Sequence, residues 1–323
     1  NADSDNNQAD AGDFHFGHDR TGTTGGTELM TIKQSGNIGI GTTSPYAKLS
    51  VVGETVSASF NATTTTGYKQ DNTILLTSSS TIKGTFLGFG AGTTTSSTGL
   101  DNTFLGYWAG QANTTADNNT AIGSNALYFN KTGYSNSAVG SYALYSNTTG
   151  FENTAMGYQA LYTNTTADGN TAVGRRALYS NTTGDTYNTA VGMSALYSNT
   201  TGVYNSALGT LALYSNTIGG NNSALGYHAG YFIDTGSNNL LLGYQAGNNI
   251  TSGSNNIIIG YDIDAPSATA SNQLNIGNLI FSKGIDGTGT TLSTGNVGIG
   301  TTSPYAKLSV EGSSALGNSA LAG

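Results

Sequence analysis

Few side chains in this chain of 323 residues could act as acids, bases or metal ligands. It contains three histidines and no cysteine. His15 and His18 lie in the segment Phe-His-Phe-Gly-His-Asp, and two imidazoles beside Asp19 could bind a metal ion on a symmetry axis. Because Phe14 and Phe16 alternate with His15 as on a half-buried strand, we instead expect exposed strand positions for these histidines.

The sequence does not indicate a catalytic constellation. Hydroxyl side chains are abundant but histidines are rare, which disfavours a Ser-His-Asp triad. Glycoside hydrolysis needs two placed carboxylates, whereas Glu54, Glu152 and Glu311 are scattered along the chain. The Gly-x-Gly at 39–41 precedes a turn and a strand, not the helix that a nucleotide fingerprint requires. We therefore predict that the protein is not an enzyme and uses no cofactor or metal.

Asparagine is the residue whose spacing most suggests modification. Asn-x-Ser/Thr sequons recur along the chain, and five of them share one turn position in the phrase Asn-Thr-Thr. Either glycosylation or turn chemistry copied by duplication would produce this pattern, and we favour turn chemistry. The sequons include those at Asn113, Asn118, Asn130, Asn147, Asn164, Asn181, Asn199 and Asn249.

The elements that position these side chains belong to a seventeen-residue repeat, roughly Asn-[Ser/Thr]-Ala-[Val/Ile/Leu/Met]-Gly-x-x-Ala-Leu-Tyr-x-Asn-Thr-Thr-Gly-x-x. A degenerate copy opens at Gly84 and another at Gln273. A short fixed period makes each unit one layer of a stack, because a single unit cannot bury its own apolar face. The other copies begin at Asn102, Asn119, Asn136, Asn153, Asn170, Asn188, Asn205, Asn222, Asn239 and Asn256.

We predict an all-β fold, a parallel β-roll or β-solenoid of about 11–12 coils. Seventeen residues give a contour of roughly 56 Å, enough for two short strands and two turns. The strands are expected at Thr-Ala-Val-Gly and near Ala-Leu-Tyr-Ser, with Asn-Thr-Thr-Gly as a turn. Helix is disfavoured by the Gly, Asn, Thr and Ser content. An ice-binding surface is disfavoured because the Thr-Thr pairs lie in turns.

Two neighbouring strand columns are apolar, which predicts a buried surface on each side of the strand. One side can face the coil interior, and the simplest cover for the other is a second copy of the chain. We assign the fourth repeat position to the coil core: Leu105, Ile122, Val139, Met156, Val173, Val191, Leu208, Leu225, Leu242 and Ile259. We assign the third position to the oligomer interface: Phe104, Ala121, Ala138, Ala155, Ala172, Ala190, Ala207, Ala224, Leu241 and Ile258.

Three further columns suggest ladders between layers. The fifth position is always Gly, which indicates positive φ or close backbone contact. The leading Asn column could form an amide ladder. A Tyr column could be a carbohydrate-stacking surface or a half-buried ladder sealing one edge, and we favour the ladder. The tyrosines are Tyr128, Tyr145, Tyr162, Tyr179, Tyr197, Tyr214 and Tyr231.

The composition limits the partners. Charged residues make up 9% of the chain and the net charge is −8. Only Lys131, Arg175 and Arg176 are basic between residues 84 and 273, so we expect no nucleic-acid binding. No apolar run approaches the roughly 18 residues of a membrane span, so we expect no membrane insertion in this segment. Residues 177–282 contain no Lys or Arg, which favours an extracellular or cell-surface location. The start at Asn1 suggests a processed product or a segment of a longer protein.

A second module brackets the repeats. Residues 36–51 read Gly-Asn-Ile-Gly-Ile-Gly-Thr-Thr-Ser-Pro-Tyr-Ala-Lys-Leu-Ser-Val, and residues 295–310 repeat this with Val297 in place of Ile38. These modules look like connectors that continue a fibre or join subunits head to tail. We therefore divide the chain into an arm with the first strands (1–35), an N-terminal connector (36–56), a neck (57–83), a repeat β-roll (84–281) and a C-terminal connector (282–323).

The Asn-Ser/Thr-Ala-Val/Leu-Gly columns of residues 84–277 resemble the head repeats of trimeric autotransporter adhesins. In that family short coils stack as a parallel β-roll and three chains associate side by side. The resemblance implies a homotrimer and an adhesive role, with surface glycans or proteins of a host as further partners.

The Gly-Asn-Ile/Val-Gly-Ile-Gly-Thr-Thr-Ser-Pro-Tyr-Ala-Lys-Leu phrase at 36–49 and 295–308 is similar to the shaft sequence of phage tail fibres and of large bacterial surface proteins. Both resemblances imply an extracellular homotrimeric fibre. We expect a structural fibre protein with an adhesive role at a bacterial cell surface, and a bacteriophage tail-fibre shaft for host recognition is the alternative.

Overall fold

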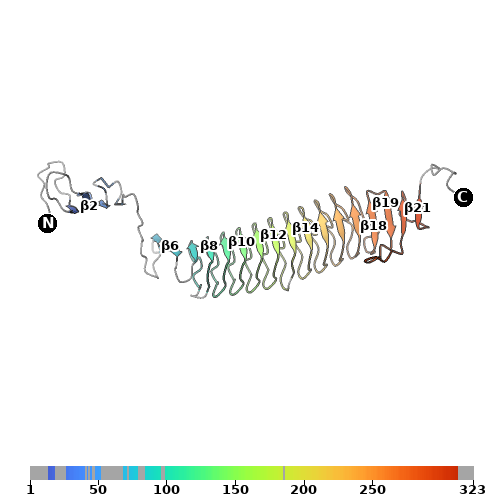
Figure 1. Ribbon diagram of the computed structural model, residues 1–323, viewed down its shortest axis with the longest axis horizontal. Coiled ribbons are helices and arrows are strands. Elements are labelled where there is room, and N and C mark those ends of the chain that lie inside the picture. Colours follow the sequence, from blue (N-terminus) through green and yellow to red (C-terminus); the bar gives the residue numbers. More distant parts are fainter. Residues whose placement is uncertain are drawn as a thin grey trace. The chain divides into compact units, whose positions relative to one another are not determined.

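A computed structural model describes residues 14–18, 27–40, 42, 44–45, 48–51, 68–70, 73–78, 84–95, 99–184 and 186–311. Every regular element in these residues is a β-strand (Figure 1), which confirms the predicted all-β fold. The chain divides into two compact units, residues 1–61 and 62–323. The finer division into arm, connectors, neck and roll stays a prediction.

The first unit contains one four-stranded sheet. Its strands are β1 (Phe14–His18), β2 (Thr27–Ile32), β3 (Ile38–Ile40) and β4 (Leu49–Val51). They pair in that order, the first two ladders antiparallel and the last parallel. The N-terminal connector therefore supplies β3 and β4 of a sheet that also includes the strands before it.

The second unit is a parallel β-solenoid with one three-residue strand per coil, which confirms the prediction from the repeat. Identical repeat positions pair between coils, as in Ala138↔Ala155. The strands are β7 (Thr85–Leu87), β8 (Thr103–Leu105), β9 (Thr120–Ile122), β10 (Ser137–Val139), β11 (Thr154–Met156), β12 (Thr171–Val173), β13 (Thr189–Val191), β14 (Ser206–Leu208), β15 (Ser223–Leu225), β16 (Leu240–Leu242) and β17 (Ile257–Ile259).

Other strands extend this sheet at both ends. β5 (Tyr68–Gln70) and β6 (Thr73–Ser78) lead antiparallel into β7. β18 (Gln273–Ile276) continues the parallel stack, and it is followed by β19 (Ile280–Lys283), β20 (Asn296–Ile299) and β21 (Leu308–Val310). No ladder among the described strands joins β5 to β21, so the sheet is open and long (Figure 1).

The two connector modules belong to four-stranded arrangements of the same topology. β18 to β21 pair antiparallel, antiparallel and parallel, as β1 to β4 do. The Nδ2 of Asn37 donates to the carbonyl of Pro45 at 3.3 Å, and the Nδ2 of Asn296 donates to that of Pro304 at 3.2 Å. The C-terminal copy differs by a longer loop, residues 284–295, between its two middle strands. The sequence duplication is therefore also a structural duplication.

Backbone in the left-handed region turns each coil. Leu127 has φ 51° and Asn125 has φ 58°, and the equivalent residues of other coils are similar. The predicted second strand at Ala-Leu-Tyr-Ser is wrong, because left-handed residues are not extended. The segment still bonds to the next coil, with Leu127 N donating to Ala143 O at 3.0 Å. The invariant glycine column was predicted to have positive φ or a close backbone contact, and both are present. Gly123 has φ +131°, and a Cβ there would lie 2.7 Å from Gly140.

The structure reverses the roles predicted for the two apolar strand columns. Side chains at the third repeat position point into their own coil and are at most 3% exposed in a single chain. They cannot form the predicted oligomer interface, and we call them the inner row: Phe104, Ala121, Ala138, Ala155, Ala172, Ala190, Ala207, Ala224, Leu241 and Ile258.

Side chains at the fourth position point outward and are not the coil core. Met156 is 47% exposed and Leu208 is 50% exposed. We call them the outer aliphatic row: Leu105, Ile122, Val139, Met156, Val173, Val191, Leu208, Leu225, Leu242 and Ile259. The physical reason is space, since Ala126 and Leu127 of the following segment enter the same interior and are fully buried. The inward-pointing residue of the strand therefore has room for little more than the methyl group of alanine.

In several coils a large side chain on the strand is matched by a glycine at a later position. Where the strand carries Phe104 instead of alanine, the position of the usual leucine is Gly110, and a Cβ there would lie 2.5 Å from the Phe104 ring. Gly247 likewise accompanies Leu241, with a Cβ 2.6 Å from its Cδ2. A close-packed interior explains the exchange, because a large side chain at one position requires a small one opposite.

Candidate interaction surface

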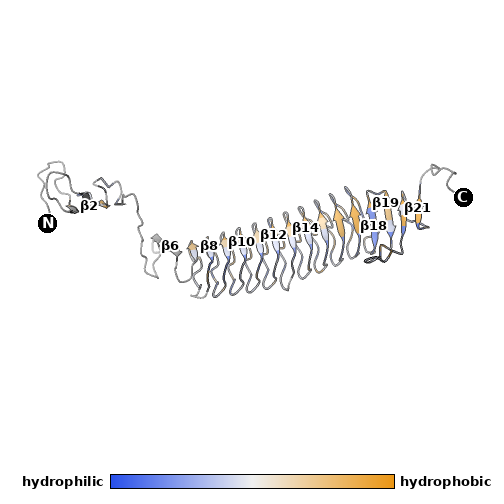
Figure 2. Cartoon of the chain, viewed as in Figure 1, coloured by the Kyte–Doolittle hydropathy of each residue, from blue (hydrophilic) through white to orange (hydrophobic). Residues whose placement is uncertain are grey.

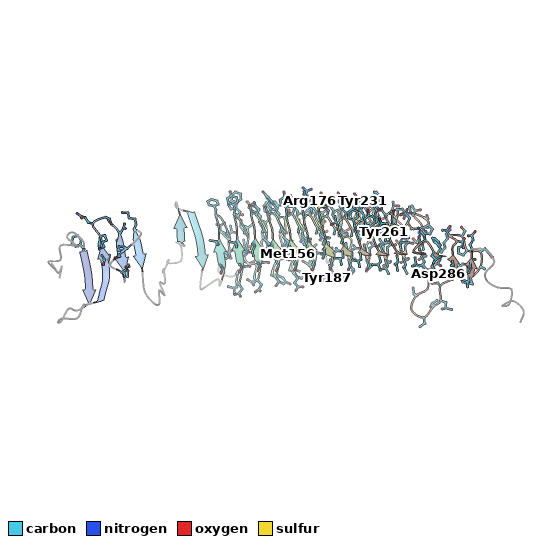
Figure 3. The ribbon with its side chains drawn as sticks, turned by 90° about the horizontal axis from the view of Figure 1, so that it is seen from above. Met156, Arg176, Tyr187, Tyr231, Tyr261 and Asp286 are labelled. Atoms are coloured by element: carbon cyan, nitrogen blue, oxygen red, sulfur yellow. The ribbon has the colours of Figure 1, made fainter. Side chains whose placement is uncertain are left out.

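The exposed face of the sheet carries two parallel rows of side chains. Each solenoid strand presents the outer aliphatic row and, two residues earlier, a second row. In nine consecutive coils this second row is Thr or Ser, and we call it the hydroxyl row: Thr85, Thr103, Thr120, Ser137, Thr154, Thr171, Thr189, Ser206 and Ser223. In Figure 3, Met156 lies on this strand face, with Arg176 and Tyr187 toward opposite edges of the stack.

The outer aliphatic row continues past the last repeat. The cross-strand register runs from Ile259 to Ile276, then to Ile280, Ile299 and Val310. Strand direction reverses at β19 and again at β20, so sequence spacing changes at each step. An aliphatic side chain nevertheless occupies the same line each time. Duplication of the repeat does not account for residues outside it, so the row indicates a requirement of the face itself.

The second row also becomes aliphatic near the C-terminal end. After Ser223 the register continues through Leu240, Ile257 and Leu274, and beyond Ser282 through Val297 and Leu308. Figure 2 shows mostly hydrophobic strands there, with the polar β18 among them. We call the described strands β16–β21 the wide apolar patch. Sequence reasoning missed it, although the phrases Asn-Leu-Leu-Leu-Gly and Asn-Ile-Ile-Ile-Gly contain the signal.

Buried asparagines hold the coils together through two ladders. In the leading column the Oδ1 of Asn119 accepts the backbone N–H of Asn136 at 2.9 Å, and its Nδ2 donates to Gly133 O at 2.9 Å. In the turn column the Nδ2 of Asn164 donates to the Oδ1 of Asn147 at 2.8 Å and to Ala167 O at 3.0 Å. Each amide is satisfied inside the coil, as burial of a polar group requires.

These ladders decide between glycosylation and turn chemistry at most of the sequons. Asn113, Asn130, Asn147, Asn164, Asn181 and Asn199 are at most 1% exposed. A glycan cannot be attached to them in the folded chain. Their recurrence is turn chemistry, as favoured from the sequence. Asn118 and Asn249 are more accessible.

The predicted tyrosine column forms a stack of rings. Successive centroids from Tyr128 to Tyr231 lie 5.0–5.4 Å apart. Interior rings therefore have a neighbour on both faces and are half-buried, which favours a sealing ladder over a sugar-stacking surface. Burial first, and then the neighbouring tyrosines, raise the pKa of Tyr162 above its usual value.

One histidine is packed into the aromatic edge. The His228 ring stacks between Tyr227 and Tyr231, with centroids at 4.0 and 4.6 Å. Its Nε2 is buried and has no hydrogen-bond partner. Burial lowers the pKa of His228 below its ordinary value. The ring serves as a flat packing element between two tyrosines.

The long loop of the C-terminal connector, residues 284–295, borders the wide apolar patch. Asp286 accepts hydrogen bonds from the backbone N–H of Thr294, at 2.6 Å, and from its hydroxyl. The hydroxyl bond is the main reason that the pKa of Asp286 is lowered. Figure 3 shows Asp286 on a loop that projects from the stack. With Leu274 and Val297 the loop encloses a shallow groove of about 690 Å³.

The described residues offer no group of three or more metal-ligating side chains. The side chains of His15 and His18 on β1, and residue Asp19, lie outside the described part, so the choice between metal ligands and exposed strand positions stays open. No helix in the described ranges is long and apolar enough to cross a membrane. In comparisons with known proteins, no family model, no curated protein and no solved structure matches the chain.

Proposed function

We propose that the protein is a structural segment of an extracellular fibre with an adhesive role at a bacterial surface. Its copies associate side by side as a homotrimer through the exposed sheet face. The observation that carries this proposal is the outer aliphatic row, which continues unbroken through strands that do not belong to the repeat. Contiguous exposed apolar surface of this kind is typical of interaction sites.

The solenoid itself suits a spacer. Parallel pairing of identical coils and two buried asparagine ladders make each layer repeat the last. At about 4.8 Å per layer, the eleven strands β7–β17 span roughly 50 Å. A rod of this construction supplies reach and stiffness. We accordingly propose a structural role and no catalytic one.

Native mass measurement of the full chain tests the association. The expected result is three times the 32.8 kDa of one chain, with rods in negative-stain electron microscopy. A protein that stays at the mass of one chain at micromolar concentration would contradict the proposal. The adhesive role is tested separately, by binding of labelled protein to a glycan array and to intact cells. If the protein bound neither glycans nor cells, the proposed adhesive role would be refuted.

A bacteriophage tail-fibre shaft is the second candidate. The duplicated connector module favours it, since the same four-strand topology occurs before and after the solenoid along the chain. Immunogold labelling separates the two sources. Gold on virions supports the shaft, and gold on the surface of intact bacterial cells supports the adhesin.

A further inference from the structure

We infer that the wide apolar patch on β16–β21 aligns neighbouring copies parallel and in register. This inference rests on the proposed self-association and specifies its geometry. Its basis is the asymmetry of the exposed face along the stack. Toward the N-terminal end, aliphatic residues form a single row beside hydroxyls, whereas toward the C-terminal end both rows are aliphatic apart from Ser282.

The patch is accessible in a single chain. Leu240 and Leu242 are 42% and 39% exposed, and Leu308 is 61% exposed. The other members of the two rows on β17–β20 are partly exposed, with the exception of Ser282, which is buried and donates its hydroxyl to Asn296 O at 2.8 Å. Aliphatic side chains therefore face solvent on each of these strands, which soluble surfaces normally avoid.

The area is sufficient for a specific interface. A fully exposed aliphatic side chain contributes on the order of 100 Å² of apolar surface. At the observed exposures the outer aliphatic row, with its continuation to Val310 and with Leu87, which pairs with Leu105, then offers about 500 Å². The second-row residues of the patch bring this close to the roughly 800 Å² per partner of a standard interface.

A second copy of this chain is the partner that fits. The rows repeat at about 4.8 Å, a spacing that another stack of the same coils reproduces. From β7 to β18 neither row contains a charged side chain. Two copies can thus approach through this face without repulsion, although each carries a net charge of −8.

Parallel alignment follows from matching the two halves of the face. With copies parallel and in register, the patch packs on the patch and the hydroxyl row lies beside the hydroxyl row. With copies antiparallel, Leu240 and Ile257 of one chain would lie on Thr or Ser of the other and would lose apolar contact. Burial of apolar surface is roughly proportional to contact area, so the parallel arrangement binds more tightly.

Site-directed cross-linking reads the alignment directly, because the protein has no cysteine of its own. Thr103→Cys and Ser223→Cys each place one thiol on the hydroxyl row, seven coils apart. Each variant alone is treated with a short bis-maleimide. The expected result is efficient cross-linking of each variant with itself, since in-register parallel copies bring identical positions together.

The decisive variant replaces two aliphatic residues of the patch by serine, which removes part of the difference between the two ends of the second row. Leu240→Ser/Ile257→Ser installs the kind of hydroxyl residue that nine other coils already carry, so the coil itself is expected to fold. We expect association to weaken on the order of 100-fold. When Thr103→Cys is added to this variant, self-cross-linking should fall at least twofold at equal oligomer fraction. Leu105→Ser/Ile122→Ser is the matched control, which weakens association but keeps the alignment.

The outcomes separate this inference from the proposed function. A wild-type protein that is monomeric would overturn self-association itself. An oligomer in which neither cysteine variant cross-links with itself would exclude parallel alignment and leave self-association standing. Unchanged self-cross-linking in Leu240→Ser/Ile257→Ser would show that the patch does not set the alignment. Circular dichroism of each variant verifies that the solenoid is intact.

Discussion

Replacing Phe104 by alanine and Gly110 by leucine together should cost far less stability than the two single substitutions imply. The pair converts this coil to the composition of its neighbour, which has Ala121 and Leu127 at the equivalent positions. Phe104→Ala alone leaves a cavity and should cost about 3–5 kcal/mol. Gly110→Leu alone should cost about 2–4 kcal/mol, because even a Cβ would lie 2.5–2.6 Å from Phe104 ring atoms.

In the double variant the leucine fills the space that the phenyl ring leaves. Leucine tolerates the required backbone, since Leu127 adopts φ 51° in the next coil and Gly110 has φ 57°. The remaining loss should be about 1–2 kcal/mol, the cost of a left-handed leucine and imperfect packing. The coupling free energy between the two sites is then at least about 3 kcal/mol.

Urea denaturation followed by tryptophan fluorescence measures this coupling. Trp108 is the only tryptophan and lies in the same coil, so its signal reports local unfolding even when the long array does not unfold as one unit. If the double variant lost as much stability as the two single variants added together, the two positions would not share one core space.

Three further predictions concern the ladders, the buried histidine and the stack. Asn164→Ala removes three side-chain hydrogen bonds of the ladder and should cost about 3 kcal/mol or more, whereas exposed Thr166→Ala should cost under about 0.5 kcal/mol; equal losses in urea would refute the ladder. Because the folded pKa of His228 is lowered, the unfolded chain takes up the proton first, and stability should fall as pH drops below about 6.5. His228→Asn should flatten this profile, and an unchanged slope would exclude His228 as its source. Deleting residues 188–204, one whole coil, should leave a cooperative fold with a small shift in melting temperature; complete unfolding would contradict independent stacking of coils.

Much of the architecture followed from the period. Matching residues seventeen positions apart define the register between coils, and a fixed period with Gly and Asn at the corners leaves little choice but a parallel solenoid. The position of the second strand could not be predicted. It depends on Leu127 and its equivalents adopting left-handed backbone, which leucine rarely does and which no propensity indicates.

The sidedness of the strand was not predictable from alternation alone. Two adjacent apolar columns indicate that both faces of the strand are buried in the assembled protein. They do not indicate which column points into the coil. A second signal was present in the sequence, because Phe86, Phe104 and Leu241 occur in coils whose later position is glycine instead of leucine, although the coil of Ala224 also has glycine there. Anticorrelated volume between two columns means that both fill one space, and that criterion selects the inner row correctly. The register of the outer aliphatic row beyond Ile276 required the strand pairing itself.

The buried asparagine seam has a consequence for how long such a protein lasts. Spontaneous deamidation requires the backbone nitrogen of the following residue to attack the side-chain carbonyl carbon. At Asn164 the amide is bonded on the Nδ2 side, and the following nitrogen, that of Thr165, donates to Thr182 O at 3.0 Å. Neither partner of the cyclisation is free to move. Asparagine is often counted as thermolabile, but here the buried asparagines are protected from deamidation. Deamidation is therefore expected first at exposed asparagines in the turns and not in the core.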